Sequence, residues 1–251
     1  MSFNHFLLAL QFLTRLPVSG VVHFDARELN RSAIWFPLVG VIIGGFVAGA
    51  AILGVRVDAW LGALLGLVVW IWITGGLHLD GLADLADALG ASHRDPERFL
   101  TVLRDPHIGA FGALALIIAT GSKLILIALA LKAAHTLVVS LPLTAAWARW
   151  GALIWSSTLP ALTAGHGEKF SWHKATGAAI GWGCVLLLAS AAFAPALVVA
   201  PLIVLLWRSF LGKRVGGMTG DCLGAGIEIT EVVLLLVAVC VQDWHLDFRN
   251  L

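Results

Sequence analysis

Residues 60–90, "WLGALLGLVVWIWITGGLHLDGLADLADALG", join an almost unbroken apolar run to a segment with three aspartates. An apolar membrane core of about 30 Å takes roughly 20 helical residues to cross, so the first part has the character of a membrane helix. The pair Gly75–Gly76 punctuates the helical pattern. We therefore predict a membrane helix that ends at a surface, followed by a short acidic helix outside the apolar core.

The composition of the whole chain supports a membrane protein. Of its 251 residues, 59% are hydrophobic and 12% are charged, whereas soluble domains carry roughly 25% charged residues. The mean hydropathy is +0.93, and a soluble fold would have too little polar sequence to cover its surface. We predict an all-α, polytopic membrane helical bundle that forms one domain over residues 1–251. The net charge of +1 gives no reason to expect nucleic acid as a partner.

Seven segments are apolar and long enough to be candidate membrane spans. They are residues 33–55, 57–77, 108–131, 135–159, 177–193, 195–211 and 224–242. The fifth and sixth are short and are separated by "FAPA", so they form either a hairpin or a broken pair. Residues 3–13 have helical apolar spacing and form either an interfacial helix at the membrane surface or a helix packed on the bundle.

The positions of lysine and arginine predict the orientation. With the N-terminus in the cytoplasm and seven spans, the cytoplasmic segments hold most of the 16 basic residues: Arg15, Arg27, Arg31, Arg94, Arg98, Arg104, Lys169, Lys174, Arg208, Lys213 and Arg214. The opposite side holds Arg56, Lys132 and Arg249. The loops 78–107, 160–176 and 212–223 then share the cytoplasmic face, where we expect the active site.

The acidic segment reads as a short helix over residues 80–90. The helical period places Asp80, Asp84 and Asp87 within about 60° of one another, opposite an apolar face. A simpler explanation is that Asp80 is the N-cap of this helix and that Asp84 and Asp87 face water. However, carboxylates four residues apart repel unless a positive charge lies between them. Oxygen ligands favour Mg²⁺, which binds carboxylates together with substrate phosphates. The neighbouring His78 is a candidate for metal binding or proton transfer, or it lies at the interface without a chemical role.

Two further stretches carry polar residues to the same face. In "RDPHIGAFG", residues 104–112, Asp105 is either the N-cap of the third span or a reactive group. In "GGMTGDCLGAGIEITE", residues 216–231, glycine-rich backbone that precedes a helix can present N–H groups to phosphates, although a flexible turn is the alternative. Asp221 lies in this stretch, and Glu228 and Glu231 follow in an apolar span, where acids suggest function.

Basic residues inside spans need partners. Arg149 and Lys123 fall within predicted membrane helices, so each requires an acid or a phosphate nearby. Most of the loop cations are explained by membrane orientation.

The sequence resembles the cobalamin synthase family, the adenosylcobinamide-GDP ribazoletransferases or cobalamin-5′-phosphate synthases. The resemblance rests on "FLTRLPV" at 12–18, "FPLVGVIIG" at 36–44, "GGLHLDGLADLADALGA" at 75–91, "RDPHIGAFGALAL" at 104–116 and "GGMTGDCLGAGIEITE" at 216–231. These matches occur in family order over most of the chain. Leu79 stands where the family often has Glu, and Pro106-His107 stand where it often has Ser-Arg.

The resemblance implies a reaction in which adenosylcobinamide-GDP and α-ribazole, or its 5′-phosphate, give adenosylcobalamin, or its 5′-phosphate, and GMP. It implies Mg²⁺ dependence and a multi-pass protein of the bacterial inner membrane. In this scheme the metal ligands are Asp80, Asp84, Asp87 and Asp221. Asp105, Glu228 or His78 accepts the proton of the attacking ribazole hydroxyl. The phosphates are contacted by Arg104, Lys213, Arg214, Gly217 and Gly220.

Two other functions remain possible at this stage. A CDP-alcohol phosphotransferase also combines membrane helices, Mg²⁺ and aspartates, but Asp84 and Leu85 occupy the Ala and Arg positions of its D-G-x2-A-R motif. A cation-coupled transporter would use charges at the middle of the membrane, whereas most acids here fall in loops.

Overall fold

The computed structural model describes residues 3–18, 26–92, 95–133, 138–162 and 176–247. Within these residues the chain is helical, and the only β-type pairing is an isolated bridge between Ala161 and Met218. The positively charged residues Arg94, Lys169, Lys174 and Arg249 lie outside the described residues.

The helices follow one another along the chain with short connections. They are α1 (Phe3–Leu13), α2 (Ala26–Ser32), η1 (Ala33–Trp35), α3 (Phe36–Val55), α4 (Ala59–Thr74), α5 (Leu77–Ala91), α6 (Pro96–Val102), α7 (Ala110–Ala133), α8 (Ser140–Thr158), α10 (Thr176–Phe193), η3 (Pro195–Val199), α11 (Ala200–Phe210), η4 (Leu211–Val215) and α12 (Gly220–Asp247).

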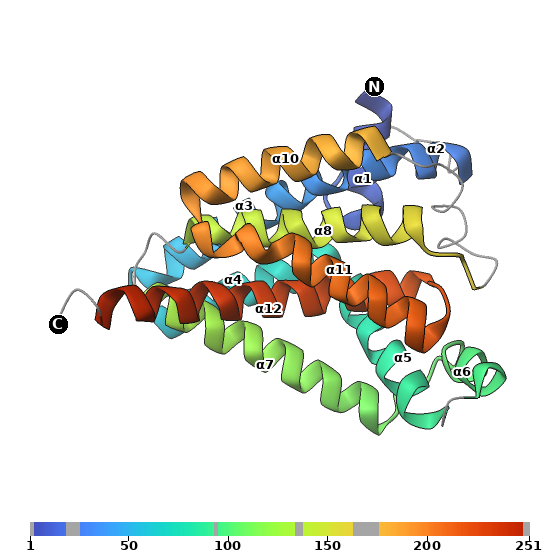
Figure 1. Cartoon of the computed structure of the whole chain (residues 1–251). Coiled ribbons are helices and arrows are strands. Elements are labelled where there is room, and N and C mark those ends of the chain that lie inside the picture. Colours follow the sequence, from blue (N-terminus) through green and yellow to red (C-terminus); the bar gives the residue numbers. More distant parts are fainter. Residues whose placement is uncertain (1–2, 19–25, 93–94, 134–137, 163–175, 248–251) are drawn as a thin grey trace.

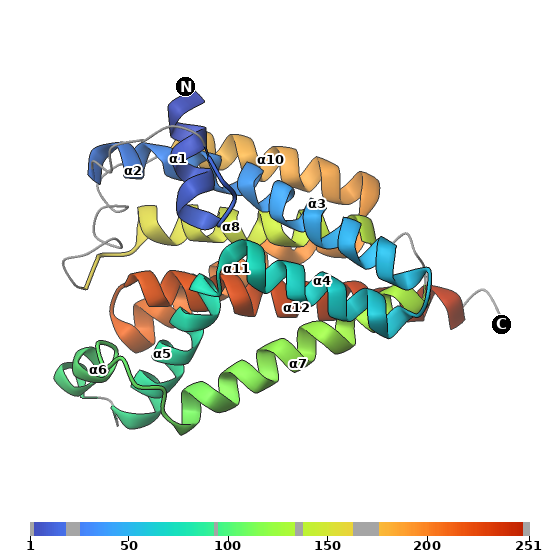
Figure 2. The ribbon, with the colours of Figure 1, turned by 180° about the vertical axis from the view of Figure 1, so that it is seen from behind.

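Figure 1 shows the long helices running side by side between two ends of a bundle, with α5 and α6 gathered at the right-hand end. We call this the α5 end. Figure 2 shows the same arrangement from behind, with the α3–α4 turn at the other end. Helix occurs in all seven ranges predicted as spans. Of the two alternatives for the segments on either side of "FAPA", the structure shows the hairpin, which is formed by α10 and α11.

Length and composition support fewer spans than the seven predicted. Within the part of the chain that the structure describes, five helical segments are individually long and apolar enough, namely 33–55, 110–133, 176–193, 195–215 and 220–241. Helix α4 has 16 residues and reaches the criterion together with α5, from which it is bent by 85°, so the number rises to at most six. Helix α8, which contains the buried Arg149, is not among them.

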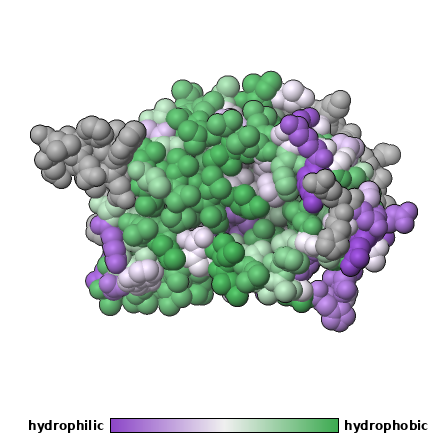
Figure 3. Space-filling view, turned by 60° about the horizontal axis from the view of Figure 1, so that its bottom comes forward, coloured by the Kyte–Doolittle hydropathy of each residue, from purple (hydrophilic) through white to green (hydrophobic). Residues whose placement is uncertain are grey.

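The surface agrees with a membrane protein. Apolar side chains cover the middle of the face in Figure 3, and hydrophilic residues gather toward the ends. Large side chains that would be buried in a soluble protein are exposed here, including Leu188, Ile117 and Leu206. Such a continuous apolar surface marks contact with lipid. The chain is therefore a polytopic membrane helical bundle.

The turn between α4 and α5 sets the position of the acidic helix. Gly75 and Gly76 have φ angles of 65° and 75°, a region that glycine enters at little cost. The two glycines make the 85° bend without a linker, so α5 begins at Leu77 rather than at residue 80 as predicted. Gly76 is the N-cap and Asp80 lies in the first turn, so the N-cap explanation of Asp80 is wrong.

The N-terminal helix packs on the bundle. Leu8, Ala9 and Leu13 of α1 are buried, whereas Phe3 is exposed. After α1 the backbone N–H of Arg15 donates to the carbonyl of Ile73 at 2.8 Å. This bond ties the N-terminal segment to the end of α4, beside the glycine turn.

Candidate active site

Three aspartates from opposite halves of the chain meet where α5 crosses α12. A Cβ atom on Gly81 would lie 2.9 Å from both Cα and the carbonyl oxygen of Asp221, so the two backbones touch there. Glycine is required because any side chain would push the helices apart. The crossing brings Asp80 and Asp84 beside Asp221, and we call these three residues the acid cluster.

The carboxylates of the acid cluster interact electrostatically. Burial raises the pKa of Asp84 to about 6, and the negative charges of Asp80, Asp221 and Asp87 add to this increase. Asp84 is half-buried, and no cation is among the causes of its shift. The acid cluster is therefore a place where a bound cation would relieve repulsion.

Asp87, the third acid predicted to bind metal, has a different environment. Its side chain is 9% exposed, and its two oxygens accept hydrogen bonds from the backbone N–H groups of Gly109, at 2.7 Å, and Gly112, at 2.9 Å. These donors belong to the start of α7, so Asp87 caps that helix from a neighbouring element. A Cβ atom at either glycine would lie 2.5 Å or less from the Asp87 carboxylate. A residue with a side chain at position 109 or 112 would therefore displace Asp87 from these hydrogen bonds.

Two cavities meet at Asp80. The inner cavity has a volume of about 260 Å³ and lies between α1, α3, α5, α8 and α12. The polar residues in its lining are His78, Asp80 and Asp221. The outer hollow, of about 670 Å³, is also lined by Asp80 and adds Arg15, Thr14, Gly75 and Gly76. Phe12, Leu77 and Asp80 line both cavities, so the two cavities adjoin at the start of α5.

A buried ion network lies in the interior of the bundle. The Lys123 Nζ atom donates to Glu228 Oε2 at 2.6 Å and also to Glu231, and Arg149 donates to the other oxygen of Glu231. All four side chains are almost fully buried. The prediction that Lys123 and Arg149 require acidic or phosphate partners is therefore confirmed. We call these four residues the buried ion network.

His78 connects the buried ion network to the inner cavity. Its Nδ1 atom lies 3.4 Å from Nη2 of Arg149, while its Nε2 atom is buried and has no partner among the described residues. Burial, with the charges of Arg149 and Lys123, lowers the pKa of His78 well below its usual value. The imidazole is therefore neutral.

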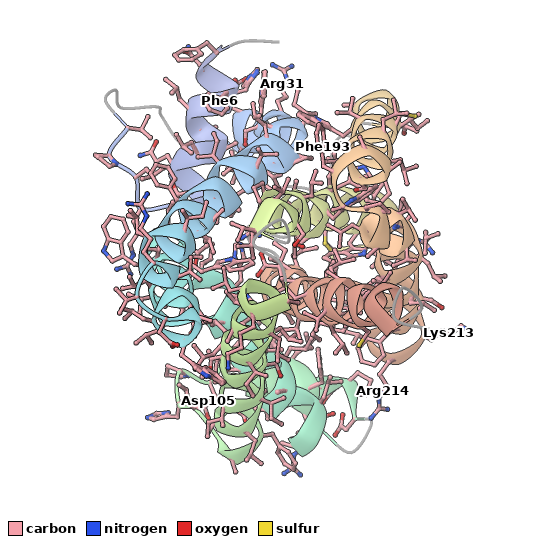
Figure 4. All side chains as sticks on the ribbon, turned by 90° about the vertical axis from the view of Figure 1, so that its left-hand side faces the viewer. Phe6, Arg31, Asp105, Phe193, Lys213 and Arg214 are labelled. Carbon is pink, nitrogen blue, oxygen red and sulfur yellow. The ribbon has the colours of Figure 1, made fainter. Side chains whose placement is uncertain are left out.

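Asp105, which was predicted as a candidate catalytic residue, is not among the residues that line either cavity. Asp105 is exposed in the loop before α7, where it accepts hydrogen bonds from the backbone N–H and the ring Nδ1 of His107, and these bonds lower its pKa. Since α7 begins at Ala110 and is capped by Asp87, the N-cap explanation of Asp105 is wrong. Figure 4 shows Asp105 on one side of the view, and Lys213 and Arg214 on the other.

The predicted phosphate contacts are also distributed over the surface. Arg104, Lys213 and Arg214 are exposed, and Arg214 lines a small separate cavity beside α6. Gly217 packs against the Pro160 carbonyl, whereas Gly220 begins α12 and lines the inner cavity. Of these five, Gly220 alone borders either cavity at the acid cluster, and the phosphate roles of all five stay predictions.

Two residues near the site were not singled out by sequence. Arg15 was assigned to membrane orientation, but its guanidinium lies against Gly75, where a Cβ atom would be 2.3 Å from Nε, and it lines the outer hollow. Gly81 lies next to Asp80 in the sequence and was not predicted to have a role, and it allows the close contact between α5 and Asp221. The sequence contained a signal for Gly81, because glycine in mid-helix lowers stability unless packing requires it.

The chemistry of the acid cluster fits a hard divalent cation. Its ligands would be carboxylate oxygens, which suit Mg²⁺ better than softer metals. Among the described residues no three His, Cys, Asp or Glu side chains already converge as a metal site. Mg²⁺ commonly uses one or two carboxylates and takes its other ligands from water and substrate phosphates, so a preformed protein cage is not needed.

Comparisons with known proteins identify the family of the chain. The family model for cobalamin-5-phosphate synthase matches residues 5–239. A protein of Laribacter hongkongensis is 52% identical over 238 residues, which cover 93% of this chain and 95% of the relative. One of Thiobacillus denitrificans is 50% identical over 236 residues, with 92% and 93% covered. One of Novosphingobium aromaticivorans is 46% identical over 243 residues, with 95% and 97% covered.

All three relatives are named adenosylcobinamide-GDP ribazoletransferase. No solved structure matches the chain significantly. The family model spans α1 to α12 and therefore includes every residue of the acid cluster and of the buried ion network. On these matches, the chain belongs to the cobalamin-5-phosphate synthase family.

Proposed function

We propose that this protein is a membrane transferase that joins adenosylcobinamide-GDP to α-ribazole, or to α-ribazole 5′-phosphate, and releases GMP. The family membership and the names of the relatives support the reaction. The observation that carries the proposal is the acid cluster at the crossing of α5 and α12, where Asp80 lines both cavities and Asp221 lines the inner one. A reaction between two substrates at a diphosphate needs such an arrangement.

The bond changes follow from the substrates. A ribazole hydroxyl oxygen attacks the phosphorus attached to cobinamide, a new P–O bond forms, and the bond from this phosphorus to the bridging oxygen breaks. GMP leaves with that oxygen. Asp80 and Asp221 would hold Mg²⁺, which, when bound, neutralises the charge that develops on the diphosphate. Arg15, at the outer hollow, would contact the phosphate oxygens.

The hydroxyl proton needs an acceptor close to the diphosphate. Asp105 is exposed and is not among the residues that line either cavity, and Glu228 is paired with Lys123 inside the bundle. Asp84 belongs to the acid cluster beside Asp80 and Asp221 and is only half-buried, so its carboxylate is available to accept a proton there. We therefore assign the proton to Asp84, and the variants described in the Discussion distinguish this role from metal binding.

The distribution of charge supports a cytoplasmic site in a bacterial inner membrane. Among the described residues, Arg15, Arg31, Arg98 and Arg208 belong to the α5 end, whereas Arg56 and Lys132 flank the far ends of α3 and α7. Excess Lys and Arg marks the cytoplasmic side. The buried ion network argues against a transport path, because its charges neutralise one another.

Purified protein tests the proposal directly. We expect GMP release from adenosylcobinamide-GDP only when α-ribazole is present, loss of release in EDTA, and recovery on adding Mg²⁺. Release of GMP without ribazole would indicate a hydrolase. Full activity in EDTA would reject the metal assignment while leaving the transferase reaction intact.

A further inference from the structure

A third hollow lies at the surface of the bundle, between α8, α10 and α11. Figure 1 shows α10 and α11 joined through η3 and diverging toward the α5 end, with α8 between them. The hollow has a volume of about 660 Å³ and is lined by residues within 150–160, by residues within 176–180 and by Arg208. We call it the α8–α10 groove. It shares no described lining residue with the inner cavity or the outer hollow.

The helices around the α8–α10 groove expose apolar side chains. Residues 176–193 and 195–215, which contain α10 and α11, are both long and apolar enough to cross a membrane. Ile180, which lines the groove, is 62% exposed, and Leu188 of α10 and Leu206 of α11 are also exposed. Since such surfaces of a membrane bundle contact lipid, the groove opens toward the bilayer.

Polar and apolar residues occupy different levels of the groove. Ser157 and Thr158 lie at the C-terminal end of α8 and Thr176 is the first residue of α10, so all three are at the α5 end. Ile154 and Trp150 lie one and two turns earlier in α8. From Thr158 to Trp150 the helix rises about 12 Å, most of the roughly 15 Å that one leaflet contributes to the apolar core. The groove is therefore polar near the membrane surface and apolar toward the middle.

The polar end of the groove carries a cation in a fixed position. Arg208 is the only charged residue among the described residues that line the groove. Its Nε atom donates to Thr158 Oγ1 at 2.9 Å, and its Nη2 atom donates to the Thr158 carbonyl at 3.2 Å. The Thr158 hydroxyl in turn donates to the Ile154 carbonyl at 2.7 Å. Because Thr158 also lines the groove, these bonds hold the guanidinium itself at the groove's polar end.

The charge of Arg208 has no counter-ion in the described part of the chain. Arg208 takes part in none of the ion pairs formed there. A guanidinium carries five N–H donors, and the two bonds to Thr158 leave three without an acceptor among the described residues. Phosphate oxygens match the planar N–H groups of arginine. Basic pockets between membrane helices bind anionic lipid head groups by such contacts.

We propose that the α8–α10 groove binds one anionic phospholipid of the bilayer, with the lipid phosphate on Arg208 and an acyl chain along Ile154 and Trp150. A phospholipid combines the negative head and the apolar chain that the two levels of the groove require, and it is the molecule that surrounds a lipid-facing surface. The groove is separate from the acid cluster, so the proposal does not depend on the proposed function.

Native mass spectrometry of detergent-purified protein tests the charged contact. We expect wild type to bind one dioleoylphosphatidylglycerol at least about tenfold more tightly than Arg208→Gln does, because a hydrogen bond to a charged group is lost. Wild type should prefer this lipid to dioleoylphosphatidylcholine, and Arg208→Gln should lose the preference. The matched control is Arg98→Gln, which removes an exposed cation of α6 at the same end but outside the groove and should bind as wild type.

A second pair of variants tests the acyl chain without changing any charge. Ile180→Trp should fill the apolar level of the groove and weaken phosphatidylglycerol binding, whereas Leu188→Trp, on the same helix outside the groove, should not. Glycerophosphoglycerol, the head group without its chains, should not displace the lipid even in large excess. Displacement by this compound would show a site for soluble phosphates and would overturn the proposal.

Three other results would also overturn it. They are equal phosphatidylglycerol binding by wild type and Arg208→Gln, equal losses in Arg208→Gln and Arg98→Gln, and a wild-type dimer that Ile180→Trp dissociates, which would make the groove a contact between two copies of the chain. If Arg208→Gln does not fold, wild type decides: no preference for phosphatidylglycerol over phosphatidylcholine would reject the site.

Discussion

The acid cluster and the buried ion network use the same residue types in opposite ways. In the buried ion network, Glu228 and Glu231 are paired with Lys123 and Arg149 inside the bundle. In the acid cluster, the electrostatic influences on Asp84 come from other carboxylates, and they raise its pKa. Both groups include residues of α12, so this helix carries two acids with basic partners, Glu228 and Glu231, in its interior part and one acid of the acid cluster, Asp221, at its start. The difference indicates which acids stabilise the fold and which are available to an external cation.

The largest expected effect is on turnover at the acid cluster. Asp80→Asn and Asp221→Asn should each lower kcat by about a hundredfold or more, because charge stabilisation at the reacting phosphate is lost. The protein should still be extracted and elute as wild type. GMP release at saturating substrates measures the loss, and Asp105→Asn, at the same end but outside both cavities, is the comparison. An equal loss of kcat in Asp105→Asn and Asp80→Asn would show that the acid cluster has no special role in turnover.

Removing one acid from the buried ion network should act on stability. Glu231→Gln leaves two buried cations with Glu228 as their remaining acid, and breaking a buried pair in this way typically costs roughly 3–5 kcal/mol. We expect a lower thermal midpoint in detergent, with Glu97→Gln, on the exposed face of α6, as the matched control. A wild-type midpoint for Glu231→Gln would show that its charge is not needed for the fold.

The smallest expected effect concerns pH. Asp84 is ionised above its pKa of about 6, so kcat/KM should fall as the pH drops through that value. Higher Mg²⁺ should move this fall to lower pH, because a nearby cation favours the carboxylate.

Folding stability should depend on pH in the opposite direction from kcat/KM, so that it falls as the pH rises. A raised pKa favours the protonated folded state, so the contribution of Asp84 is present at low pH and is lost as the pH rises through about 6.

The Asp84→Asn variant separates its two possible roles. If Asp84 accepts the proton, the variant should lose turnover, and its kcat/KM should no longer fall as the pH drops through about 6. The Mg²⁺ concentration that gives the half-maximal rate should stay the same as in wild type. If Asp84 binds the metal, as the sequence alone predicted, the required Mg²⁺ concentration should rise. A variant with wild-type rate and pH profile would exclude both roles.

Much of the fold follows from the sequence because apolar length is a direct physical requirement of the membrane. All seven predicted ranges contain helix, although five or six meet the length and composition criterion, since α4 is short and bends into α5. The start of α5 was placed three residues too late. A polar Asp80 resembles an N-cap, and the two positive φ angles that allow an earlier start are properties of the folded backbone.

The candidate site was predictable in its residue types but not in its contacts. The spacing of Asp80, Asp84 and Asp87 identifies one helical face, yet the face is divided, because Asp87 turns to the start of α7. That hydrogen bonding joins residues more than 20 positions apart, and no local pattern encodes it. For the same reason the roles of Gly81 and Arg15 were not visible before the helices were arranged in space.

The contact of Gly81 with Asp221 also bears on how the protein is made. The acid cluster takes two members from α5 and one from the first turn of the last helix, about 140 residues later in the chain. A growing polypeptide therefore carries an incomplete acid cluster until α12 has been synthesised and inserted into the bilayer. We expect a chain that lacks α12 to be inactive, because the acid cluster would lack Asp221.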